Sequence, residues 1–309
     1  MSDDQTNGSP EASDGRDGCP MHGSMDVEGA EDKDILSYGS YLKIPDLLSL
    51  QQPESDPPAH DEHLFITIHQ AYELWFKQII FELLTVRDRM NEDDVYEAHR
   101  LMERVLTIMD LLVEQIHVLE TMQPRDFLAF RAALKPASGF QSIQFREIEF
   151  LTGIKRPEVL QYVELDEEER ERLETRLDEP GLGRIFFALL DRLGFDVAVP
   201  AVGETLEGED RDRTLSALAT IYGHPRDHYH VYNLAEALVD HDQKLLLWRY
   251  HHVRVVERLI STKTGTGGSP GVEYLSSTLD ERAFPLLWEA RGELSDDDFY
   301  GIDPLANLG

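Results

Sequence analysis

The hydrophobic positions of the chain recur with the period of a helix over most of its length. Apolar residues three or four positions apart predict long helices near residues 61–90, 93–121 and 228–263. Shorter helices are expected in pieces over 123–153, around a Pro/Ser/Gly break, and over 166–179, 183–195, 213–222 and 277–294. Strand-like alternation is nearly absent, and its best candidate is the short segment 195–202. The pattern therefore predicts an all-α fold, a bundle of long helices in a single domain over residues 35–309.

The first 34 residues have a different composition. They are rich in Asp, Glu, Gly and Ser and cannot bury enough apolar surface to offset the entropy of ordering. We predict a disordered acidic tail over residues 1–34. This tail holds Cys19, the single cysteine of the chain, which excludes an intramolecular disulfide. A free thiol in a disordered segment is the simplest interpretation of Cys19.

The charge balance limits the possible partners. The 309 residues carry a formal net charge of −31, from 60 acidic and 29 basic residues, which disfavours nucleic acid and anionic membranes as partners. The charge also destabilises the fold by self-repulsion, which salt screens, so we hypothesise a halophilic composition suited to a saline cytoplasm. No apolar run of about 18 residues predicts a membrane span, and no apolar leader follows a basic N-terminus. We expect a cytoplasmic protein.

The segment LLLWRYHHVRVVERLI, residues 245–260, places two adjacent histidines in an apolar helix. On a helical wheel His252 lies at the centre of the apolar arc, with Trp248 and Val256 within about 40° on either side. His251 lies about 100° away, at the border with the charged face, and is expected to reach water. A buried imidazole needs partners for its ring nitrogens. His252 is therefore either hydrogen-bonded in the core or a ligand of a metal such as heme iron.

His69 has a similar position on the predicted helix 61–90. Phe65 and Tyr72 lie near it on the apolar side of the wheel. One interpretation is a core histidine bonded to Tyr72 or Glu73 of its own helix. The other is a heme pocket, because one imidazole on the iron and a second across the pocket are typical of heme proteins. The residues alone leave both alternatives open.

Five blocks of the chain resemble the tryptophan 2,3-dioxygenase family in order and spacing, and they are YGSYL, HDEHLFITIHQAYELWFKQ, PASGFQSIQFREIEFLTG, WRYHHVRVVERLI and GTGGSPGVEYLSSTL. The resemblance runs from about Tyr38 to Trp288. It implies an all-helical homotetramer with one heme b in each subunit. It implies further that O2 is inserted across the indole C2–C3 bond of L-tryptophan to give N-formyl-L-kynurenine, the first step of tryptophan catabolism by the kynurenine pathway.

The resemblance also assigns roles to residues. It makes His252 the axial ligand of the heme iron and His69 the catalytic histidine that contacts the indole N–H. Arg131 would hold the substrate carboxylate, which a guanidinium binds through two hydrogen bonds. The remaining residues that it places at the site are Phe65, Phe127, Thr266, Tyr38 and Tyr41 for the substrate and Ser138 for the heme edge. In the family, the two tyrosines reach the pocket of a neighbouring subunit.

Some positions depart from the family or have simpler explanations. Phe127 and Phe145 stand where many relatives have Tyr, which removes hydroxyl groups near the pocket, and Pro270 replaces a common serine. Without the resemblance, Arg131 would be assigned to a helix surface and Thr266 to a helix end. The departures affect no candidate iron ligand, so they bear on substrate preference rather than on heme binding.

Three other functions compete with this interpretation. The segment HPRDHYH offers His224, His228 and His230 as zinc ligands, but no Cys or carboxylate set accompanies them, so surface histidines are the simpler interpretation. A heme sensor or carrier without catalysis would need neither Arg131 nor Thr266. A purely structural helical protein would bind no heme.

Overall fold

The computed structural model describes residues 36–162, 165–261, 263, 265 and 271–294, and its regular elements in these ranges are all helical. This confirms the all-α prediction. The predicted tail lies outside the described residues, as do Cys19 and Pro270. The chain divides into two compact units, one up to Leu50 and one from Gln51 onward. The domain boundary near residue 35 stays a prediction.

The described part of the first unit contains two short helices, α1 (Tyr38–Tyr41) and α2 (Ile44–Leu47). Ser37 caps α1, because its side chain accepts from the Ser40 amide while the Ser40 side chain accepts from the Ser37 amide. Tyr38 and Tyr41 are 79% and 69% exposed. The side chains of both predicted substrate-contacting tyrosines are therefore mostly uncovered in this chain.

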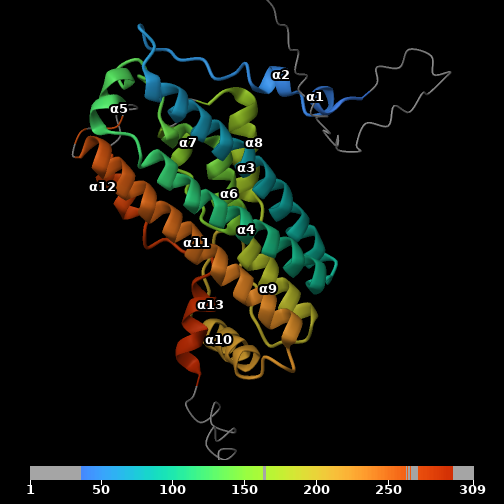
Figure 1. Cartoon of the computed structure of the whole chain (residues 1–309). Helices are drawn as coiled ribbons and strands as arrows, with labels where there is room; N and C mark the ends of the chain where they lie inside the picture. The colour runs from blue at the N-terminus through green and yellow to red at the C-terminus, as the bar shows by residue number, and fades with distance from the viewer. Residues whose placement is uncertain (1–35, 163–164, 262, 264, 266–270, 295–309) are drawn as a thin grey trace, which may run out of the picture. The chain divides into compact units, whose positions relative to one another are not determined.

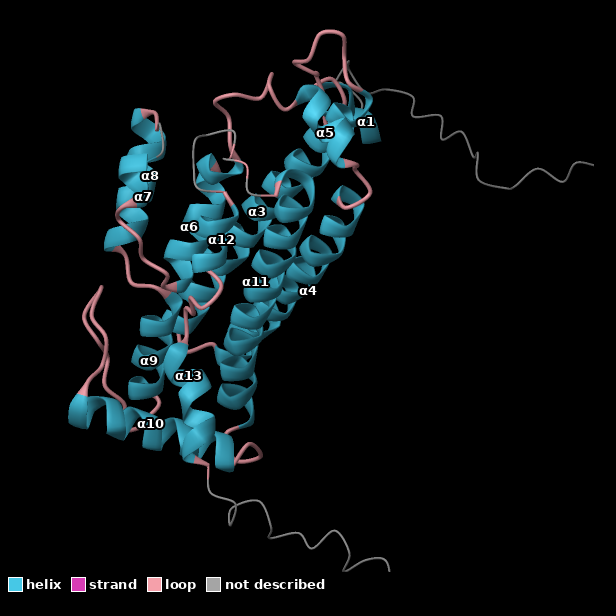
Figure 2. Cartoon of the chain, turned by 90° about the vertical axis from the view of Figure 1, so that its left-hand side faces the viewer, coloured by secondary structure: helices cyan, strands magenta, loops and turns pink. Residues whose placement is uncertain are grey.

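Three long helices form the centre of the second unit, and they are α3 (His60–Asn91), α4 (Val95–Leu119) and α11 (Tyr229–Ile260). Helix α4 packs against both α3 and α11, and all three run side by side in Figures 1 and 2. Their bounds lie within three residues of the predicted ones. The apolar stripes meet in a common core, whose fully buried members include Leu83, Val86, Met102, Val105 and Leu238.

Shorter helices complete this unit. They are α5 (Pro124–Phe130), η1 (Gly139–Gln141), α6 (Ile143–Thr152), α7 (Val159–Tyr162), α8 (Glu167–Asp178), α9 (Leu182–Arg192), α10 (Gly208–Gly223), α12 (Val272–Ser277), α13 (Pro285–Glu289) and η2 (Ala290–Glu293). Helix α6 packs on α3 and α8, and α12 packs on α11. Figure 1 shows α5 and α12 near one end of α11 and α10 near its other end. The unit is therefore a bundle whose segments from α5 to α6 and around α12 lie beside the late half of α11.

The structure contains no strand at the best strand candidate, and it corrects the start of one predicted helix. Residues 195–202 form no strand, and the Ala198 amide donates instead to Thr214 Oγ1 at 2.9 Å. A side-chain acceptor thus replaces the neighbouring strand that a sheet would supply. The helix expected over 277–294 begins only at Pro285, as α13 followed by η2. Proline disfavours the helical conformation of the residue before it, which explains this late start.

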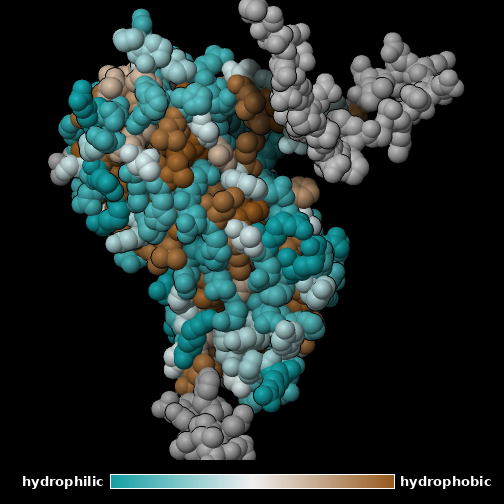
Figure 3. All heavy atoms as spheres, viewed as in Figure 1, coloured by the Kyte–Doolittle hydropathy of each residue, from teal (hydrophilic) through white to brown (hydrophobic). Residues whose placement is uncertain are grey.

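The surface is mainly hydrophilic on the face drawn in Figure 3, with separate hydrophobic patches between the hydrophilic side chains. Of the helices that the structure describes, none is long and apolar enough to cross a membrane. This agrees with the sequence, which has no long apolar run.

Candidate functional site

One cavity in the second unit brings most of the predicted site residues together. Its walls come from α3, α4, α11, α12 and the segment from α5 to α6, and they are mostly apolar. The predicted site residues that line it are Phe65, His69, Phe127, Arg131, Ser138 and His252. Gly265 and Gly271 also line it, and Thr266 lies between them in the sequence. Thr266 itself lies outside the described residues.

His252 lies on α11 at the wall of this cavity. Its ring stacks on that of Trp248, one turn earlier, with centroids 5.3 Å apart and planes at 21°. No described residue hydrogen-bonds to either ring nitrogen. Burial lowers the pKa of His252 to about 4, and repulsion from His69 adds to the effect. The imidazole is therefore neutral near pH 7, which is the form that binds a metal.

His69 lies on α3 and borders the same cavity. Its Nδ1 lies 2.7 Å from the carbonyl oxygen of Phe65, so the helix backbone is its partner rather than Tyr72 or Glu73. Because a carbonyl only accepts, Nδ1 carries the proton and Nε2 of the neutral ring keeps its lone pair. Burial lowers the pKa of His69 and favours this neutral form. His69 thus offers one hydrogen-bond acceptor to a ligand.

Aromatic rings form much of the cavity wall. The Phe65 ring lies 5.9 Å from that of Phe127, measured between centroids. The Phe145 ring lies 4.9 Å from that of Trp248 and 5.6 Å from that of Phe76. Phe127 and Phe145 both line the cavity, as the sequence predicts, so the hydroxyl groups of the family's tyrosines are missing from its wall. Flat apolar walls of this kind suit planar aromatic ligands.

Arg131 and Ser138 come from the segment between α5 and α6. Arg131 is the C-cap residue of α5 and is partly buried, unlike the surface residue expected without the resemblance. The Ser138 hydroxyl accepts from the Phe140 amide at 3.3 Å and caps η1. Ser138 therefore has a structural partner as well as a place on the wall. The binding roles of both residues stay predictions.

A buried group of charged residues borders the cavity, and the sequence analysis did not single it out. Glu149, whose side chain is 1% exposed, pairs with Arg146 at 2.7 Å, Arg156 at 2.6 Å and Arg249 at 2.5 Å. Burial alone would raise the pKa of Glu149, but attraction by the three guanidinium groups outweighs it and lowers the pKa. Glu281 lies 3.4 Å from Arg156 and 3.3 Å from Arg249. Three positive charges against two negative ones leave a net +1 beside the cavity, which suits an anionic group.

Local sequence signals for this group existed. Arg146 and Glu149 lie three positions apart in helix α6, and Arg249 lies one turn before His252 on α11. Such spacing places each pair on one side of its helix. Nothing in a linear pattern shows, however, that the two helices meet at Glu149.

The histidines of HPRDHYH are not grouped as metal ligands among the described residues. The His224 Nδ1 bonds to the Thr220 carbonyl at 3.1 Å, and the His228 ring packs on that of Phe195 with centroids 5.1 Å apart. Among the described residues, one group has three potential metal ligands within 4.8 Å of one another. That group does not include His224, His228 or His230. His224 and His230 are exposed and His228 is partly buried, which fits the simpler interpretation of histidines near the surface.

The comparisons with known proteins agree with these observations. The model of the tryptophan 2,3-dioxygenase family matches residues 23–193 and 203–294. A tryptophan 2,3-dioxygenase of Nocardioides sp. is 48% identical over 277 residues, which cover 88% of this chain and 98% of that protein. Proteins of the same name from Herpetosiphon aurantiacus and Bacillus anthracis are 46% and 39% identical, over 84% and 85% of this chain and 98% and 94% of their own lengths. The chain belongs to the tryptophan 2,3-dioxygenase family.

Proposed function

We propose that this protein is a heme-dependent dioxygenase that converts L-tryptophan and O2 to N-formyl-L-kynurenine. Membership of the family supports the reaction. The observation that carries the proposal is the neutral His252 imidazole, which has no hydrogen-bond partner among the described residues and lies on the wall of an aromatic-lined cavity. The buried His241 on the same helix also lacks a partner but does not line the cavity, so the position on the cavity wall is what distinguishes His252.

The residues of the cavity fit one heme b per subunit. His252 would bind the heme iron, and the ring of Trp248 would form part of the apolar wall that holds the heme. The excess positive charge of the Glu149 group, with buried Nε atoms of Arg146 and Arg156 that lack partners, suits the carboxylates of the heme. Bound heme iron would supply the activation of O2, which protein side chains do not provide.

His69 would orient the substrate. Its Nδ1 is held by the Phe65 carbonyl, so Nε2 is left to accept the indole N–H. Phe65 and Phe127 would pack on the indole ring. Since the substrate is fixed relative to the reacting centre before reaction, this positioning lowers the entropic part of the barrier. An acceptor without a matching donor is costly when buried, so the site would disfavour ligands without an N–H group.

The amino-acid end of the substrate needs charged and polar partners. We propose that Arg131, which lines the cavity, binds the substrate carboxylate. Thr266, the neighbour in sequence of the lining residue Gly265, would bind the same end of the substrate. Ser138 would lie at the heme edge. Tyr38 and Tyr41 would complete the pocket of a neighbouring subunit, and their high exposure in the single chain supports this assignment.

The proposed homotetramer and its saline, cytoplasmic environment are supported by exposed apolar side chains and by the composition of the chain. A homotetramer is supported by large apolar side chains that stay exposed in the single chain, among them Leu74, Phe81, Tyr96, Leu111 and Tyr250. The single cysteine suits a reducing compartment such as the cytoplasm, and the charge of −31 suits a saline one. Light scattering of the purified protein, with and without added salt, measures the oligomer directly.

The test compares two adjacent histidines. We expect His252→Ala to lose the Soret band and the formation of N-formylkynurenine, and His251→Ala to keep both. His69→Ala should keep the Soret band while turnover of L-tryptophan falls. The proteins are purified with heme, reduced, and mixed with L-tryptophan and O2 while formylkynurenine absorbance is followed. An unchanged Soret band in His252→Ala would overturn the assignment of the iron ligand, and a heme-loaded wild type without product would overturn the activity.

A further inference from the structure

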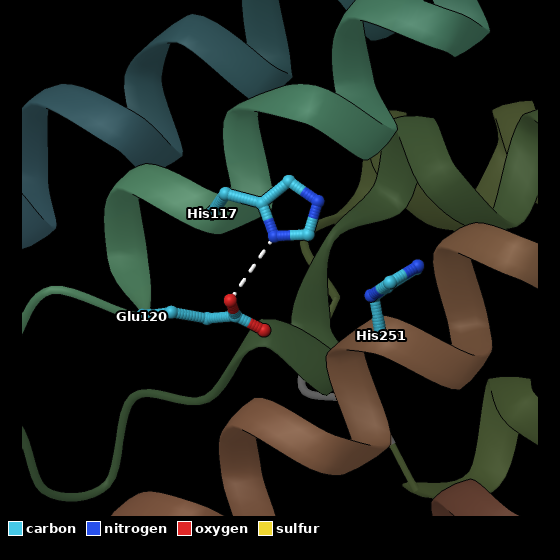
Figure 4. A group of neighbouring side chains, drawn as sticks. All are labelled: His117, Glu120 and His251. Atoms are coloured by element: carbon cyan, nitrogen blue, oxygen red, sulfur yellow. Dashed lines mark hydrogen bonds and ion pairs between the residues drawn. The ribbon is translucent and has the colours of Figure 1, made fainter.

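A second group of potential metal ligands lies outside the cavity, where α4 ends beside α11. His117 and Glu120 come from the end of α4, and His251 comes from α11. One ligand atom of each residue lies within 4.8 Å of those of the other two. Figure 4 shows the three side chains pointing toward a common space. The group therefore lies between the two helices, and its member on α11, His251, directly precedes His252 in the sequence.

The helices bring these three residues together for simple reasons. His117 and Glu120 are three positions apart, which places them on one side of α4, and Glu120 is the C-cap residue of that helix. Helix α4 packs against α11, and the rings of His117 and His251 meet edge to face with centroids 5.2 Å apart. Ile116 and Leu119 on the adjacent side of α4 line the cavity instead. The group is therefore separate from the cavity.

The donor set is specific in its chemistry. Two imidazoles and one carboxylate suit zinc and similar transition-metal ions, whereas magnesium and calcium prefer sites made only of oxygen atoms. Around a tetrahedral ion the ligand atoms lie about 3.4 Å apart, so the present separations of up to 4.8 Å must shorten slightly. The His117 and Glu120 side chains are 45% and 28% exposed and have room to rotate. Their direct hydrogen bond, Nδ1 to Oε2 at 3.0 Å, is shorter than this distance, and a bound ion would replace the proton between them.

We propose that His117, Glu120 and His251 bind one divalent transition-metal ion of the zinc class. Two neutral imidazoles and one carboxylate neutralise half of the charge of the ion and leave one coordination position for water. The ion ties the end of α4 to α11. Because both helices also contribute to the cavity wall, through Leu119 and His252, the ion restrains that wall from outside.

Isothermal titration calorimetry of the full-length, heme-loaded protein tests this site. The protein is first treated with a chelator, and Zn2+ is then added in the presence of excess Mg2+. The chain has 12 histidines, so one binding event is assigned by difference. We expect His117→Asn and His251→Asn each to weaken one Zn2+ binding event at least tenfold. His230→Asn, an exposed histidine at the start of the same helix α11, serves as the matched control and should bind like the wild type.

Thermal unfolding gives a second readout. Saturating Zn2+ should raise the unfolding midpoint of the wild type and of His230→Asn, because the ion binds the folded state, and should leave the midpoints of the two ligand variants unchanged. Equal Zn2+ affinity in wild type and both ligand variants would overturn the site. The site would also be overturned if His251→Asn bound Zn2+ more weakly while His117→Asn bound it like the wild type, since the ion must bridge both helices.

Discussion

Replacing Glu149 by Gln removes one negative charge from a buried group of charged residues. The Glu149 side chain is 1% exposed and pairs with Arg146, Arg156 and Arg249. Those three guanidinium groups are 6%, 11% and 5% exposed. After the substitution, Glu281 remains as the acid near two of them, at 3.3 and 3.4 Å. The variant therefore leaves buried positive charge without sufficient compensation.

The magnitude follows from the burial of these groups. Removing one partner of a buried ion pair costs about 3–5 kcal/mol, because the other partner stays desolvated and unpaired. The glutamine side chain keeps one neutral acceptor atom, its carbonyl oxygen, because its amide nitrogen only donates, so three guanidinium groups share that oxygen. For a chain of this length, about 2 °C of unfolding midpoint corresponds to each kcal/mol. We expect Glu149→Gln to lower the midpoint by about 6–10 °C.

The pH dependence gives an independent readout. The pKa of Glu149 lies below its ordinary value in the folded state, so the unfolded chain binds the proton more readily. Stability from Glu149 is therefore complete above the unfolded pKa, near 4.5, and is lost as the pH falls through the folded pKa. The difference between wild type and Glu149→Gln should be largest near pH 7 and shrink below pH 4.5.

The assay is differential scanning calorimetry or thermal circular dichroism from pH 7 downward, over the range in which unfolding is reversible. Glu97→Gln is the matched control, because Glu97 pairs with Arg100 on the surface, where such pairs contribute little. Equal midpoints of Glu149→Gln and wild type at pH 7 would refute the reasoning. So would a difference between them that grows as the pH falls.

Two further results are expected. Tyr72→Phe should lower the free energy of unfolding by about 1 kcal/mol in denaturant titrations. The buried Tyr72 hydroxyl donates to the Leu112 carbonyl at 2.9 Å and so ties α3 to α4. An unchanged free energy of unfolding would show that this hydrogen bond has no net effect. Raising NaCl from about 0.1 to 1 M shortens the screening length from about 10 to 3 Å. Because this screens the repulsion within a chain of charge −31, the unfolding midpoint should rise. A constant or falling midpoint would exclude the halophilic interpretation.

The long helices were predictable because each buries a continuous apolar stripe, which leaves a period of three to four residues in the sequence. Helices α3, α4 and α11 follow that period closely. The segment 195–202 was the best strand candidate, but its buried residues Val197 and Ala198 do not belong to a sheet. Its backbone is satisfied by a threonine side chain from α10, and such a long-range partner leaves no periodic signal.

The site was predictable only in part, for a related reason. The wheel places His252 among the apolar residues of α11, and the structure has Val255 and Leu259 buried on that side. The Glu149 group, in contrast, assembles residues up to 135 positions apart, from Arg146 to Glu281, and the local spacing of its members does not show that they meet. Charged residues inside an amphipathic helix normally face water, so a buried guanidinium becomes visible only when its distant partner is placed.

The two adjacent histidines show how one helix serves two environments. A step of about 100° separates His251 from His252 around α11. His252 enters the cavity, where burial keeps its ring neutral, while His251 meets the ring of His117 on the packed neighbour α4. A one-residue insertion before this pair would rotate both rings by the same step and remove each from its partners at once. The spacing of the pair is therefore constrained by two sites, and a substitution at one histidine can test one site without moving the other.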